Sequence, residues 1–182
     1  MAELAHAALG GWESFYVIVG SSGAALIGLQ FVVITLVAER RSASESESIG
    51  AFGTPTVVHL GGALLISAIM SAPWPSLLAV ALALAACGVA GVLYEATVVD
   101  RARRQTSYRP DREDWAWYII LPTCAFVVLA LAALFLPTKT GGALFVIAGV
   151  ALGLLLIAIH NAWDTVTYIA VSNPTGDRTN GE

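Results

Sequence analysis

The sequence predicts an all-α polytopic membrane protein, a bundle of five transmembrane helices with its N-terminus outside and its C-terminus inside. The chain of 182 residues is 57% hydrophobic and only 12% charged. A soluble domain would carry roughly 25% charged residues, so this chain has too much apolar surface to fold in water. The charges are gathered into short segments, and most of the stretches between them are about as long as the 20 residues that a membrane-spanning helix needs.

The five spans follow from the positions of the charges. Residues 14–38 and 115–138 carry no charge at all. The apolar stretch 48–94 is too long for one span, and it divides at the sequence SAPWPS, residues 71–76. The expected spans are about 14–38, 54–71, 75–99, 113–136 and 141–166, within a single domain of residues 1–171 that is followed by a disordered cytoplasmic tail at 172–182.

Helix-end signals agree with these boundaries. Thr54 is a suitable N-cap, and Pro55 then occupies the first helical position, where its missing N–H costs nothing. Pro75 opens the third span in the same way. The ends of the last two spans are marked by Pro110 with the acidic residues after it, by Pro137 and by the Gly141–Gly142 pair.

The basic residues predict the orientation. With the N-terminus outside, only Lys139 is external, and the other eight of the nine Lys and Arg residues are internal: Arg40, Arg41, Arg101, Arg103, Arg104, Arg109, Arg112 and Arg178. The positive-inside rule favours this arrangement. Trp115, Trp117 and Tyr118 would then belong to an inner belt of interfacial aromatic residues, and Trp12 and Trp74 to an outer one.

The same residues indicate the location of the protein. Arginine greatly outnumbers lysine, which is typical of a GC-rich bacterial genome. No Lys or Arg precedes the first apolar stretch, so the start of the chain does not resemble a cleavable signal peptide. We therefore expect a multi-pass protein of the bacterial cytoplasmic (inner, plasma) membrane, with membrane lipids as its surroundings.

Polar side chains within the spans are the candidate functional residues, because such groups are costly in lipid. At about 1.5 Å of rise per residue, four different spans carry them to a similar depth in the cytoplasmic half. The expected polar site comprises His59, Glu95, His160 and Asp164, supported by Gln30 and Asn161.

Small residues mark the faces on which membrane helices pack closely. The residues expected at such contacts are Gly20, Ala24, Gly28, Gly88, Gly91, Gly149 and Gly153. The polar groups share helical faces with small residues, which predicts that they point into the bundle. The Gly20–Ala24–Gly28 stripe could also bring two copies of the first span together, and a homo-oligomer of this kind could line a pore.

The leading functional hypothesis is the conduction, sensing or coordination of a proton or small cation. His59 and His160 change charge near neutral pH, and Glu95 or Asp164 would tune them. A channel or transporter would use the same residues to line a path on the cytoplasmic side.

Two cofactor hypotheses use the same side chains, although no cofactor is the simplest expectation. His59, His160, Asp164 and Glu95 together could hold a metal ion through nitrogen and oxygen ligands. His59 and His160 alone could be the two axial ligands of a haem b between spans.

A competing hypothesis is a non-catalytic accessory or partner-binding subunit whose polar layer only stabilises the bundle. No hydrolase, nucleotide-binding or phosphate-binding motif is present, so we do not expect an enzyme. Cys87 and Cys124 lie in apolar stretches and read as small hydrophobic residues. There is no basic patch with interleaved aromatic residues, which argues against nucleic acid as a partner.

Overall fold

The computed structural model describes residues 2–38, 46–104 and 112–172, and every element in these ranges is helical. Five stretches are long and apolar enough to cross a membrane: Glu13–Thr35, Thr54–Ser71, Leu77–Arg101, Ala116–Phe135 and Thr140–Thr167. The prediction of an all-helical chain with five such helices is confirmed. Arg40, Arg41, Arg109, Pro110, Arg178 and most of the predicted tail lie outside the described residues.

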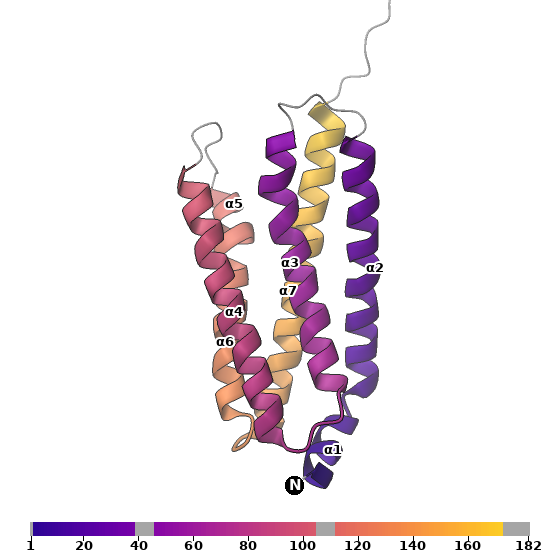
Figure 1. Cartoon of the computed structure of the whole chain (residues 1–182), viewed down its shortest axis with the longest axis vertical. Helices are drawn as coiled ribbons and strands as arrows, with labels where there is room; N and C mark the ends of the chain where they lie inside the picture. Colours follow the sequence, from indigo (N-terminus) through magenta and orange to yellow (C-terminus); the bar gives the residue numbers. More distant parts are fainter. Residues whose placement is uncertain (1, 39–45, 105–111, 173–182) are drawn as a thin grey trace, which may run out of the picture.

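The helices run nearly parallel to the long axis of the molecule (Figure 1). Their bounds are α1 Ala2–Gly10, α2 Glu13–Ala38, α3 Ser46–Ser71, α4 Leu77–Arg104, α5 Arg112–Trp115, the π-helix η2 Ala116–Ile120, α6 Leu121–Phe135 and α7 Thr140–Ser172. Short α1, which the sequence analysis does not assign, lies across one end of the bundle (Figure 1).

Helices α3 and α7 form the centre of the bundle. They pack against each other, with α2 on one side and the α4–α6 pair on the other (Figure 1). The core lies where these helices meet, and its fully buried side chains include Leu60, Ile66, Leu84, Leu129, Ile147 and Leu154. Among the five spans, α7 is the most buried and α2 the least. Each of the five spans keeps large exposed apolar side chains, as expected for a surface in contact with lipid.

The two ends of the bundle differ in charge. One end holds the C-terminal ends of α2, α4 and α7 and the starts of α3 and α5 (Figure 1). We call it the arginine end, because Arg101, Arg103, Arg104 and Arg112 belong to the helix ends found there. The opposite end, the α1 end, holds α1, the 72–76 connection and Lys139. The described basic residues are therefore segregated in the way that the sequence predicts.

Two predicted helix starts are wrong. Helix α3 begins at Ser46 and contains Pro55 in its interior, because an internal proline removes a single backbone hydrogen bond and membrane helices tolerate that loss. Helix α4 begins at Leu77 rather than at Pro75. The hydroxyl of Ser76 accepts a hydrogen bond from the Ala79 N–H at 3.2 Å, so Ser76 is the residue that caps this helix.

The predicted small-residue contacts divide into two groups. A Cβ at Gly20 would come within 3.0 Å of the Ser67 Cβ on α3, and a Cβ at Gly88 would come within 2.8 Å of the Ala130 nitrogen on α6. Gly91 meets Phe126 of α6. By contrast, a Cβ at Gly28, Gly149 or Gly153 would meet nothing within 4 Å in the described part of the chain, and Ala24 is exposed. Helical spacing identifies a shared face, but it does not tell whether a neighbouring helix covers that face.

Candidate functional site

Among the described His, Asp, Glu, Lys and Arg side chains, the most deeply buried are His59 on α3 and Glu95 on α4. Their side chains are 0% and 1% exposed, and His59 Nε2 lies 2.8 Å from Glu95 Oε1. We call them the His59–Glu95 pair. The contact joins two different spans in the interior of the bundle, where an ionisable side chain without a partner would be strongly destabilising.

The pair satisfies only half of its hydrogen-bonding capacity. Within the described ranges, His59 Nδ1 and Glu95 Oε2 are both buried and have no hydrogen-bond partner. One proton shared along the 2.8 Å contact gives either a charged imidazolium–carboxylate pair or a neutral imidazole–carboxylic acid pair. The two remaining atoms can accept or release a further proton.

A phenylalanine lies directly beside the pair. The ring of Phe126, on α6, is centred 6.5 Å from the His59 ring. It occupies the space left by two glycines: Gly62, three residues after His59 on α3, and Gly91, four residues before Glu95 on α4. A Cβ at Gly62 would come within 3.2 Å of the Phe126 ring, and one at Gly91 would overlap it. These glycines allow a large apolar ring from a third helix to reach the pair.

His160 and Asp164 form a separate and more exposed pair on α7. Their nearest charged atoms, Nε2 and Oδ2, are 3.1 Å apart without hydrogen-bond geometry, and the side chains are 29% and 46% exposed. The His160 ring stacks on Trp117 of η2, with centroids 3.8 Å apart and planes at 21°. The single inward-facing layer that the sequence suggests is therefore two pairs.

Asn161 is the fully buried polar residue of α7, and it connects α7 to η2. Its Nδ2 donates a hydrogen bond to the Trp117 carbonyl at 3.3 Å, and the Tyr118 hydroxyl donates to the Asn161 carbonyl at 3.2 Å. Tyr118 is buried, so it is not part of the interfacial belt predicted from the sequence.

The π-helix explains why the Trp117 carbonyl is available. In a regular α-helix the Trp117 carbonyl would accept a hydrogen bond from the Leu121 N–H. Here the Leu121 N–H donates instead to the Ala116 carbonyl, five residues back. Pro122 has no N–H of its own and its ring crowds the preceding turn, which favours this wider turn. Sequence reasoning missed this contact, and the signal for it was a proline inside a predicted span.

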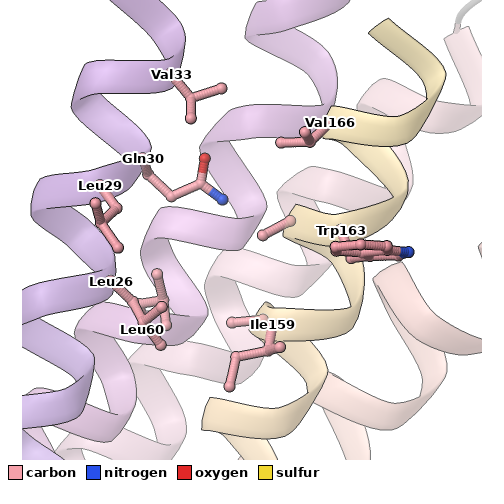
Figure 2. Close-up of a pocket in the computed structure, with 10 residues that line it drawn as sticks. Leu26, Leu29, Gln30, Val33, Leu60, Ile159, Trp163 and Val166 are labelled. Carbon is pink, nitrogen blue, oxygen red and sulfur yellow. The ribbon is translucent and has the colours of Figure 1, made fainter. Parts of the chain in front are cut away.

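Gln30 lies in an apolar groove between α2, α3 and α7 rather than at the His59–Glu95 pair. Figure 2 shows its side chain extending from α2 into the groove. The groove has a volume of about 310 Å³, and apart from Gln30 its walls are mainly aliphatic, with Leu26, Leu60 and Ile159 among them. Trp163 lies at its α7 side (Figure 2) and is 69% exposed.

The arrangement does not fit the two cofactor hypotheses. In the described part of the chain, no three His, Cys, Asp or Glu side chains gather as a metal site, so the predicted set of His59, His160, Asp164 and Glu95 does not assemble. For a bis-histidine haem, both imidazoles would have to direct a nitrogen at one iron. Instead, His59 Nε2 faces Glu95 and the His160 ring is stacked on Trp117.

Comparisons of the chain with protein-family models, curated proteins and solved structures found no match. A helical bundle by itself supports many unrelated activities. The function therefore has to be argued from the His59–Glu95 pair and the residues around it.

Proposed function

We propose that this chain is an integral membrane protein, oriented N-out and C-in in a bacterial cytoplasmic membrane, that binds and releases a proton at the His59–Glu95 pair. The observation that carries the proposal is the fully buried 2.8 Å contact between two spans, with one unpaired atom on each side chain. An ionisable residue within a span is by default a candidate for function.

A proton fits this site better than a metal cation does. One carboxylate and one imidazole are too few ligands for a divalent ion, which takes four or more donors. A proton needs only one lone pair, which Oε2 offers, and in the charge-balanced pair Nδ1 carries a hydrogen that it can release. The pair therefore supports the proton branch of the cation hypothesis.

Protonation at this place would act on the packing of the bundle. In the charge-balanced state the pair attracts α3 to α4. Loss of the shared proton leaves a carboxylate beside a neutral ring, and gain of a second proton leaves an imidazolium beside a neutral acid. Either change leaves one uncompensated charge in a low-dielectric interior, which is strongly unfavourable. The pair thus couples proton occupancy to the α3–α4 contact, as a pH sensor requires.

The test is a proton titration of the purified protein in detergent. The carboxylic acid and imidazole bands are followed by infrared difference spectroscopy across neutral pH. Glu95→Gln keeps the size of the side chain and can still hydrogen-bond to His59, so we expect it to fold and to lose the buried carboxyl transition. Asp164→Asn is the matched control, because it changes the exposed His–carboxylate pair and should leave that transition intact. An unchanged titration in Glu95→Gln would refute the proposal.

A second candidate is the accessory subunit, in which the pair is only a structural contact. The apolar groove between α2, α3 and α7 favours it, because partner helices dock into such grooves. In that case Glu95→Gln and the wild-type protein would show the same pH dependence of unfolding, and Leu29→Trp in the groove would reduce co-purification of a partner.

A further inference from the structure

We infer that Phe126 closes the His59–Glu95 pair to water from the α1 end, so that the pair exchanges its proton only with the arginine end. The inference rests on the proposed proton site and adds the direction of access to it. If it holds, the protein responds to the pH of one compartment and does not conduct protons through the membrane.

The position of Phe126 follows from the directions of α3 and α4. Helix α3 runs toward the α1 end and α4 runs away from it (Figure 1). Gly62 follows His59 on α3 and Gly91 precedes Glu95 on α4, so both glycines lie on the α1 side of the pair, by about 4.5–6 Å at the helical rise. Phe126 fills the space between these glycines and is only 2% exposed.

Between Phe126 and the α1 end, the core is apolar. On the α1 side, the buried side chains of the central helices are apolar, and they include Ile66, Leu84, Leu129, Ala133, Ile147 and Leu154. The buried hydroxyl of Ser67 is already used by the Ala63 carbonyl at 2.8 Å. The buried Tyr16 hydroxyl, at the start of α2, has no hydrogen-bond partner in the described residues and offers only one polar group. Water needs two to four polar partners to occupy a buried position, and these central side chains do not provide them.

The opposite side of the pair is polar. Trp117 precedes Phe126 by nine residues along the same segment, so the contacts of Trp117 lie about 13.5 Å nearer the arginine end. There Asn161 Oδ1 and His160 Nε2 are buried atoms without hydrogen-bond partners in the described residues. His160 and Asp164 are also partly exposed. These groups can hold water between the pair and the surface at the arginine end.

Because the α1 side of the pair is apolar and the other side is polar, Phe126 determines the direction from which water can reach the pair. The Phe126 ring, packed between Gly62 and Gly91, is the part of this apolar core that lies next to the pair, and apolar barriers stop conduction by excluding water. Gly62 and Gly91 have no side chains that could replace the ring if it were removed.

The experiment is proton flux in proteoliposomes with an imposed pH gradient and an internal pH-sensitive dye. The wild-type protein should show only background flux. Phe126→Ala should raise the flux several-fold, and adding Glu95→Gln to it should return the flux to background, because the leak passes through the pair. Leu136→Ala is the matched control: it opens a cavity at the α1 end of the same segment, away from the pair, and should not leak. Phe126→Val, with a smaller deletion, carries the same expectation if the alanine variant fails to fold.

The outcomes separate this inference from the proposed function. Wild-type flux above background, or a leak that persists with Glu95→Gln, would overturn one-sided access. Phe126 variants at background flux would overturn the assignment of the barrier to Phe126. In each case the carboxyl titration of Glu95 would still stand. Absence of that titration in the wild-type protein, or its persistence in Glu95→Gln, would refute the proton site itself.

Discussion

Substituting alanine at Gly91 is the most direct test of how the site is packed. The new Cβ would lie 2.6 Å from Phe126 Cε1 and closer still to two neighbouring ring carbons. Carbon atoms in van der Waals contact are normally about 3.5–4.0 Å apart, so the ring would have to move by roughly 1 Å. It has little space to do so, because Gly62 and the α3 backbone lie on its other side.

The expected cost follows from that confinement. Overpacking a well-filled core usually destabilises a protein by about 1–3 kcal/mol. Because Phe126 is 2% exposed and in contact with both glycines, we expect Gly91→Ala to lie in the upper half of this range. Gly149→Ala is the matched control, since a Cβ there meets nothing within 4 Å in the described residues. It should not destabilise the protein, and the higher helix propensity of alanine could add up to about 1 kcal/mol.

The assay is equilibrium unfolding in mixed micelles of dodecyl maltoside and sodium dodecyl sulfate, followed by tryptophan fluorescence. The quantity compared is the free energy of unfolding of each variant relative to wild type. Gly91→Ala equal in stability to wild type, or Gly149→Ala less stable than Gly91→Ala, would show that the reasoning about these helix faces is wrong.

Three further predictions follow from the contacts between helices. Asn161→Ala should lower the free energy of unfolding by about 1–2 kcal/mol, because it removes an interhelical hydrogen bond and leaves the Trp117 carbonyl without its amide partner. Thr167→Ala is the control, because it loses hydrogen bonds only within α7. In the same assay it should change the free energy of unfolding by much less. Pro122→Ala restores a backbone N–H, so the π-helix should relax to an α-helix. The Leu121 amide should then change its NMR chemical shift and its hydrogen-exchange rate. Unchanged Leu121 signals would show that the proline does not cause the wide turn. Cysteines at Lys139 and Arg103, probed with a membrane-impermeant thiol reagent on intact cells, should be labelled and protected respectively, and the opposite pattern would reverse the proposed orientation.

The division of the chain into spans could be predicted because it depends on local composition. A segment such as 115–138 has no charge and enough length to cross a bilayer whatever its neighbours are. Helix starts were predicted less well. Pro55 is compatible with either the first turn or the interior of a helix, and the choice depends on whether the residues before it also become helical. The same holds for Pro75, since the adjacent Ser76 is the better cap.

The candidate polar residues could be named from sequence, but their partners could not. His59, Glu95, His160 and Asp164 all stand out as ionisable groups in or near spans. Whether they form one layer or two pairs depends on the rotation of each helix about its own axis and on its lateral position. Gln30 shows the same limit, because a similar depth on α2 places it in the apolar groove between α2, α3 and α7 rather than at the pair.

The sequence by itself determined that this protein has five apolar helices, that its arginines are confined to a few segments outside the apolar stretches, and which few polar groups its spans contain. These properties follow from hydrophobicity and length, which act locally along the chain. Only the tertiary structure decided that His59 meets Glu95, that Phe126 lies beside them between Gly62 and Gly91, and that Asn161 binds the carbonyl freed by a π-helix. Those contacts depend on shape complementarity between helices distant in sequence, and a one-dimensional pattern does not contain that information.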